Sequence, residues 1–175
     1  GAYCWGVYGL PTFVLLNHTN NYNSVLTLGH EMGHAIHTEM SHSQPGIYAD
    51  YTMSVAETAS TLFENFVFEE IFEKLSEKEK IVALHNKIND TIATIFRQIA
   101  CFNFEKELHE TIRKEGYCSK EKIAKIMNKH MKSYLGPVVD LTEEDGYFFA
   151  NWSHLRRFFY VYSYAFGHII SDALY

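Results

Sequence analysis

The sequence predicts a mainly α-helical protein that forms one domain over residues 1–175. Three observations predict this fold: long segments carry apolar residues at helical spacing, capping residues and glycines bound these segments, and only residues 12–16 are typical of a strand. Apolar residues make up 47% of the chain and charged residues 21%, which is typical of a compact globular protein. At this length the chain can bury a continuous core.

The N-terminal region predicts a strand followed by a helix. Residues 12–16 (TFVLL) are β-branched, aromatic or aliphatic, and turn residues lie on both sides. Asn23 or Ser24 can cap a helix that we expect to run from about Val25 to about Met40. The chain therefore has one short β element before its first helix.

The middle of the chain predicts two further helices. Residues 55–75 are apolar on nearly all faces of a helix, and such a helix is expected to be buried. Ser76 and Glu79 have the spacing of a capping box and open a long helix. This helix is expected to reach about Lys114 and to end at Gly116.

Two more helices are predicted toward the C-terminus. Ser119 opens a helix over residues 120–134, which Gly136 and the following proline stop. After a polar loop, a last helix is expected from about Asn151 onward.

Charge, cysteines and hydropathy limit the class of protein. A net charge of −6 gives no electrostatic reason to expect nucleic acid or an anionic membrane as partner. The three cysteines are odd in number and widely spaced, which argues against a disulfide framework and fits a reducing compartment. The apolar segments are too short or too interrupted for a membrane span, and no signal peptide is visible. We therefore expect a soluble, cytoplasmic protein.

The ends of the sequence suggest a longer parent chain. The sequence begins at Gly1 rather than at a methionine, and it stops at Tyr175 inside a predicted helix. We expect a piece of a longer protein, in which a site shared with the rest would be incomplete.

His30-Glu31-Met32-Gly33-His34 is an H-E-x-x-H motif on the first predicted helix. Histidines four residues apart lie on one face, so both imidazoles can reach one ion. Glu31 lies about 100° further round the helix and can hydrogen-bond a water on that ion. Zinc lowers the pKa of bound water to about 7, and the carboxylate can accept its proton during attack on a peptide carbonyl. The motif therefore predicts a zinc metallopeptidase.

A catalytic zinc site needs a third protein ligand, and Glu57 is the first candidate. A carboxylate on an apolar helix is costly to bury unless a cation pairs with it. Glu64 is the rival, two turns further on the same face; one of the two can ligate while the other orients a histidine. Either can also be an ordinary solvated glutamate. His37 could close a structural site as a fourth ligand, but an orienting or packing role is favoured because Glu31 would otherwise have no water to activate.

Aromatic residues near the C-terminus form a second cluster. On a helix, Tyr160 and Tyr164 share a face with Arg157, whereas Tyr162 points elsewhere. His154 with one or two tyrosines could donate to the oxyanion of peptide hydrolysis. The alternative is a packed aromatic core with satisfied hydroxyls. Helical spacing alone does not decide between them.

Three segments together resemble the oligoendopeptidase F group of the thimet oligopeptidase-like zinc metallopeptidases. The resemblance runs from Gly1 to Tyr175 and depends on the following residues: His30 to His37 (HEMGHAIH), Asp50-Tyr51 with Val55 to Asn65 (VAETASTLFEN), and His154 with Phe159 to Gly167 (FYVYSYAFG).

This resemblance implies a zincin-like helical catalytic domain, here a fragment of a larger two-lobed peptidase with a deep channel. It implies one zinc ion per chain, short unfolded peptides cleaved internally as substrates, and the remaining lobe of the full-length enzyme as partner. Residues 12–16 would resemble an edge strand that holds the substrate backbone. By position, the resemblance implies zinc ligands His30, His34 and Glu57, the general base Glu31, and oxyanion or substrate contacts from His154 and Tyr164, joined by Tyr160 or Tyr162.

Two alternatives remain. A membrane-tethered, ATP-driven protease can also carry H-E-x-G-H, but it needs a later aspartate ligand and a nucleotide-binding segment, and no GxxxxGK[ST] occurs here. The second alternative is a non-catalytic helical module in which protein groups alone ligate zinc, so that chelation would unfold the chain.

Overall fold

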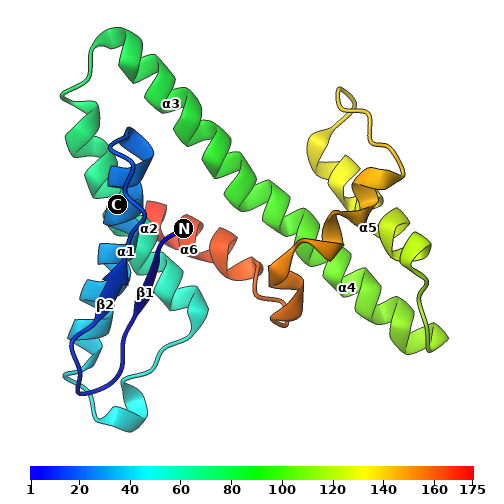
Figure 1. Cartoon of the computed structure of the whole chain (residues 1–175), viewed down its shortest axis with the longest axis horizontal. Helices are drawn as coiled ribbons and strands as arrows, with labels where there is room; N and C mark the ends of the chain where they lie inside the picture. Colours follow the sequence, from blue (N-terminus) through cyan, green and yellow to red (C-terminus); the bar gives the residue numbers. More distant parts are fainter. The chain divides into compact units, whose positions relative to one another are not determined.

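A computed structural model describes residues 1–175, and it is helical apart from one two-stranded sheet (Figure 1). This architecture confirms the predicted mainly α-helical fold with a short β element before the motif helix. The elements are β1 (Tyr3–Trp5), β2 (Phe13–Leu15), α1 (Tyr22–Ser41), α2 (Met53–Phe72), α3 (Glu77–Ile92), α4 (Gln98–Glu115), α5 (Lys120–Leu135) and α6 (Tyr162–Leu174).

The chain forms two compact units. The first contains residues 1–88 and 166–175, and the second contains residues 89–165. None of the helices is both long and apolar enough to cross a membrane.

The first unit begins with a hairpin that packs beside α1. Strands β1 and β2 are antiparallel, with Cys4 opposite Val14. These two side chains are half-buried whereas their strand neighbours are exposed. The strand over Tyr3–Trp5 was not predicted because it lacks a longer run of β-branched and apolar residues such as the one at residues 12–16.

Helix α1 begins earlier than predicted because a different residue caps it. The Asn21 side chain accepts a hydrogen bond from the Ser24 backbone N–H at 2.9 Å. Asn21 has extended backbone angles and satisfies one of the free N–H groups of the first turn. The predicted caps Asn23 and Ser24 therefore lie inside the helix.

Helix α2 differs from the prediction of a fully buried apolar helix. Its buried residues are small or polar: Ala56, Glu57, Ser60 and Asn65. By contrast, Phe66 is 46% exposed and Val55 is 46% exposed. The prediction was wrong because α1 and α6 approach α2 closely at small residues, which leaves most of its large apolar side chains half-buried and Val55 and Phe66 exposed.

The predicted capping box at the start of α3 is present. The Ser76 N–H donates to Glu79 Oε2 at 2.9 Å, and the Glu79 N–H points back to Ser76 Oγ at 3.5 Å. A π-helical segment, Ala93–Arg97, lies between α3 and α4 and was not predicted. Helix α4 ends where expected, at Gly116, whose φ of 77° favours glycine.

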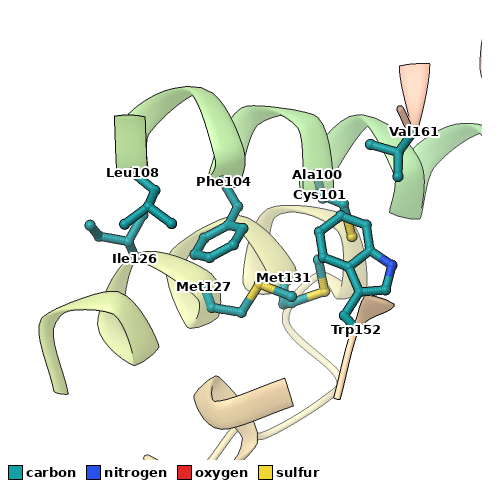
Figure 2. Packing of buried hydrophobic residues seen from close by; sticks show 9 residues of the cluster. All are labelled: Ala100, Cys101, Phe104, Leu108, Ile126, Met127, Met131, Trp152 and Val161. Atoms are coloured by element: carbon teal, nitrogen blue, oxygen red, sulfur yellow. The ribbon is translucent and has the colours of Figure 1, made fainter. Parts of the chain in front are cut away.

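The core of the second unit lies between α4 and α5. Figure 2 shows side chains of α4 pointing toward those of α5, and Phe104 and Met127 are both 0% exposed. The Ser119 side chain caps α5 as predicted, and Gly136 ends it with a φ of 74°. The buried cluster comprises Ala100, Cys101, Phe104, Leu108, Ile126, Met127, Met131, Trp152 and Val161.

The prediction of a helix from about Asn151 was wrong. A short 3-10 turn spans Ser153–Arg156, and α6 begins only at Tyr162. Between them, Phe159 has a φ of 51°. This left-handed conformation costs an ordinary residue about 1–2 kcal/mol and ends any right-handed helix. Tyr160 therefore precedes α6 instead of lying one turn before Tyr164 on the same helix.

Candidate metal centre

His30, His34 and Glu57 bring one ligand atom each to a common point. These atoms all lie within 4.8 Å of one another. Glu57 Oε2 is 3.7 Å from His30 Nε2 and 3.9 Å from His34 Nε2. The two rings stand one turn apart on α1, with centroids 4.9 Å apart and planes at 87°. Two imidazoles and a carboxylate at this separation form a donor set that suits a divalent cation.

Glycines on α1 allow this convergence by bringing α1 against α2. A Cβ on Gly33 would lie 2.7 Å from Ser60 Cα and 2.8 Å from the Ala59 carbonyl oxygen. One turn earlier, a Cβ on Gly29 would lie 2.8 Å from Val67 Cγ2. A larger residue at Gly33 would meet the backbone of α2, and one at Gly29 would meet the Val67 side chain, so both glycines permit the close approach of the helix that carries the histidines to the helix that carries Glu57.

A third glycine fixes Glu57 from the other side. A Cβ on Gly167 of α6 would lie 2.8 Å from Glu57 Cβ and 3.0 Å from the Thr58 nitrogen. Glu57 is 5% exposed, and Ser60 Oγ lies 3.3 Å from its Oε2 as a hydrogen-bond donor. The carboxylate that the sequence suggested as a ligand is thus enclosed on two sides by close backbone packing.

The protonation of His34 suits metal binding. Burial, followed by the charges of His30 and His37, lowers the pKa of His34 to about 4. The ring is therefore neutral at pH 7 and keeps a lone pair for a cation. A hydrogen bond to the Ala56 backbone also orients this ring.

His30 is held by a second carboxylate. Its Nδ1 lies 3.2 Å from Glu64 Oε2, which leaves Nε2 facing Glu57. Burial lowers the pKa of His30, but the hydrogen bond with Glu64 and the charges of Glu57 and Glu64 outweigh it, so the net shift is upward. The carboxylates thus favour positive charge here, and a divalent cation satisfies that preference while the ring stays neutral. These residues fit a metal ion.

Glu31 lies next to this donor set on α1. The residue is 7% exposed, and burial raises the pKa of its carboxyl while the charge of His30 opposes the rise. Cys4 of β1 is close enough for the charge of Glu31, after burial, to raise the pKa of the thiol. Strand β1, which was not predicted, therefore lies near the residue expected to act as base.

His37 is not part of the donor set. Its ring stacks on Tyr51, with centroids 3.9 Å apart and planes at 19°. The Tyr51 hydroxyl in turn lies 2.6 Å from Thr38 Oγ1. This position agrees with the packing role that was favoured for His37 over a fourth ligand.

The predicted C-terminal cluster assembles within the second unit. His154 Nε2 lies 2.9 Å from the Tyr164 hydroxyl. The Tyr160 ring lies 5.3 Å from the His154 ring and 5.4 Å from the Tyr164 ring. Burial, followed by the charge of Arg157, lowers the pKa of His154. The three side chains form one polar and aromatic cluster, although Tyr160 reaches it from a turn and not from α6.

Tyr162 is 50% exposed and packs against Phe102.

Sequence reasoning missed the glycines that bring the helices together. Gly29 and Gly33 are four residues apart on the face of α1 that packs against α2, and this small-residue spacing was the available signal for a close helix contact. Gly167 gave no such signal, because its partner Glu57 is far away in the sequence.

Known proteins are similar to this chain over its whole length. The sequence model of Peptidase family M3 matches residues 1–175. Oligopeptidase PepF from Bacillus subtilis is 32% identical over 99% of this chain, and the chromosomal oligoendopeptidase F of Lactococcus lactis subsp. cremoris is 33% identical over 95%. The chain spans 26% and 28% of the length of these two relatives.

Solved structures agree with this similarity. A crystal structure from Chlamydophila abortus superposes with a TM-score of 0.77 at 30% identity, covering 95% of this chain and 28% of its own. Oligoendopeptidase-F from Enterococcus faecium superposes with a TM-score of 0.68 at 27% identity, covering 87% of this chain and 27% of its own. By its full-length family match and these relatives, the chain belongs to Peptidase family M3 and is related to oligoendopeptidase F.

Proposed function

We propose that this chain is the metal-binding catalytic part of a zinc-dependent endopeptidase that cleaves internal bonds of short, unfolded peptides. The observation that carries the proposal is the convergence of His30, His34 and Glu57 within 4.8 Å, beside the buried Glu31. Membership of a peptidase family supports it. We further propose one zinc ion per chain, and the rest of a larger enzyme as the opposite wall of the substrate channel.

His30, His34 and Glu57 would hold the ion. When bound, zinc supplies the Lewis acidity that lowers the pKa of water to about 7 and polarises a carbonyl. Glu31 accepts the proton of the attacking water and later delivers it to the leaving amine. Burial of Glu31 raises its pKa, so its carboxylate takes up a proton more readily than that of a solvated glutamate, and the carboxyl can still return the proton to the more basic amine. Glu64 orients His30 through its Nδ1.

The cluster of His154, Tyr160 and Tyr164 is the proposed donor group for the substrate carbonyl as it becomes an oxyanion. The Tyr164 hydroxyl and His154 Nε2 share one hydrogen bond, and the hydroxyl can rotate to donate its proton to a developing negative charge in either tautomer of the ring. Lowering of the His154 pKa favours the neutral ring at pH 7, which can donate through one nitrogen.

Strand β2 is the proposed support for the substrate backbone. The sheet has two strands, so β2 pairs with β1 along one edge and no strand pairs with its other edge. Strand addition at such an edge gives main-chain hydrogen bonds that do not depend on the peptide sequence. This mode suits an enzyme for many short peptides.

The direct test replaces Glu31 in the full-length enzyme. Glu31→Gln keeps the shape of the side chain but removes the base, so we expect about one zinc per chain and a kcat lowered by about 10²-fold or more. Zinc content is measured by atomic absorption, and turnover is measured with an internally quenched peptide. Glu70→Gln, at a carboxylate 76% exposed on α2, is the matched control and should retain full turnover. A Glu31→Gln enzyme with wild-type kcat would refute the assignment, and a zinc-loaded wild type without hydrolysis would favour the non-catalytic module.

A further inference from the structure

Glu105 of α4 is a buried carboxylate outside the proposed metal centre. It is 1% exposed, and its Oε2 is buried without a hydrogen-bond partner. Its other oxygen, Oε1, accepts a hydrogen bond from the backbone N–H of Phe159 at 2.8 Å. A carboxylate in this position is costly to desolvate, and an apolar residue of similar size would cost less for stability alone. Glu105 Oε1 also lies 3.9 Å from His109 Nε2, but the hydrogen bond to Phe159 is the shorter contact and the one that an apolar residue could not replace at the main chain.

Phe159 needs such support because of its backbone conformation. Its φ of 51° lies in the left-handed region, which phenylalanine rarely adopts. Two rings of α4 also contact Phe159: Phe102 at 5.5 Å and His109 at 5.2 Å between centroids. Together with Glu105, these residues lie at intervals of three and four along α4 and so share one face of the helix. One face of α4 thus holds Phe159 through its main chain and its side chain.

The turn at Phe159 sets the position of the next residue, Tyr160. The Tyr160 carbonyl accepts hydrogen bonds from the Ser163 N–H at 3.2 Å and from Ser163 Oγ at 2.5 Å, which ties it to the start of α6. Its ring packs on His154 and Tyr164. A change in the φ angle of Phe159 would therefore move Tyr160 away from both partners.

We propose that Glu105 is a positioning residue, whose carboxylate holds Phe159 in its left-handed turn and thereby places Tyr160 against His154 and Tyr164. The positioning itself concerns only groups within the second unit. Its consequence for turnover rests on the proposed function of those three side chains.

Three variants at Glu105 distinguish the role of its hydrogen-bond acceptor from the roles of its charge and of its side-chain volume. Glu105→Gln keeps the acceptor oxygen and loses the charge. Glu105→Met keeps the approximate volume and loses the acceptor. Glu105→Asp keeps the charge but withdraws the oxygens by one methylene. It replaces Glu105→Met as the variant without the acceptor if the methionine variant does not fold. Ile126→Ala in the same core is the control for general loss of stability, because Ile126 is buried on α5 and is assigned no role in the cluster.

The first measurement is amide hydrogen exchange at Phe159. We expect protection of this N–H in the wild type and in Glu105→Gln, and loss of protection in Glu105→Met and Glu105→Asp. Ile126→Ala should lower the melting temperature while leaving the protection of Phe159 relative to its neighbours unchanged. Equal protection in all the Glu105 variants would overturn the proposal.

The second measurement is peptide hydrolysis by the full-length enzyme. Loss of a well-placed oxyanion donor typically costs about 10²–10³-fold in kcat, so misplacing the cluster in Glu105→Met should lower kcat by at least about tenfold with KM nearly unchanged. Glu105→Gln should restore most of this loss, and Ile126→Ala should show none. If the wild type hydrolyses peptides and Glu105→Met does so equally well, the positioning role is wrong. If the wild type does not hydrolyse peptides, the proposed function fails, while the exchange experiment still decides whether Glu105 holds the turn.

Discussion

At the scale of single residues, the proposed ligands differ in how well local spacing predicts them. His30 and His34 share one helix, so their convergence follows from a separation of four residues. Glu57 and Glu64 lie on another helix, and sequence spacing alone left both as third-ligand candidates. The structure separates them by partner: Glu57 Oε2 faces Nε2 of both histidines, whereas Glu64 Oε2 meets Nδ1 of His30. That distinction depends on how two helices pack, which no local pattern encodes.

This difference gives a ranking of zinc affinity. Glu57→Ala removes a proposed ligand, so we expect a severe loss of zinc binding. Glu64→Ala removes an orienting partner, for which a loss of about 10–100-fold is typical. Zinc affinity is measured by competition with a chromophoric chelator, with His34→Ala as the reference for a lost ligand. A larger loss in Glu64→Ala than in Glu57→Ala would reassign the third ligand.

At the scale of elements, three local capping signals were predicted correctly, whereas the environment of α2 and the start of the last helix were not. The Ser76 capping box, the Ser119 cap and the glycine at 116 are signals within a few residues, and each lies where expected. The prediction that α2 is fully buried was wrong because an apolar sequence does not reveal which face of a helix a neighbouring helix will cover. The last helix was wrong because the break at Phe159 uses a residue type that does not normally mark a turn.

The packing of α1 on α2 makes a prediction opposite to helix propensity. Alanine in place of glycine inside a helix normally stabilises by about 0.5–1 kcal/mol. At Gly33 the added Cβ would lie 2.7 Å from Ser60 Cα, so Gly33→Ala should lower the melting temperature. Because the helices must separate, zinc affinity should fall as well.

The matched control for Gly33 lies in the other unit. A Cβ on Gly146 would lie 2.4 Å from the Ala124 carbonyl oxygen, so Gly146→Ala should also destabilise. Gly146 lies outside the unit that contains the proposed metal ligands. We therefore expect the folded Gly146→Ala variant to bind zinc with the affinity of the wild type. Unchanged zinc binding in Gly33→Ala would show that the close helix contact does not set the ligand geometry.

At the scale of the whole molecule, the two units predict an uneven response to metal. All three proposed ligands belong to the first unit, whereas the buried cluster around Phe104 belongs to the second. A ligand that binds only the folded state stabilises it by about 2.7 kcal/mol at a concentration of 100 times Kd. Zinc should therefore protect amides of α1 and α2 first.

Hydrogen exchange with and without a chelator measures this response. Removing zinc should speed exchange in α1 and α2 through local opening, while amides of α4 and α5 near Phe104 and Met127 should change much less. Equal acceleration in both units would mean that they open as one cooperative body. No change in either unit would argue against a metal at the three ligands.

The uncovered apolar side of α2 has a practical consequence for handling the protein. Phe66 and Val55 are exposed apolar side chains, and fluorescent dyes such as anilinonaphthalene sulfonate bind to exposed apolar surface. A preparation of these 175 residues alone should brighten such a dye while fully folded, so dye fluorescence would be a misleading gauge of unfolding here. Far-ultraviolet circular dichroism, which follows the helices themselves, is the appropriate monitor for melting experiments.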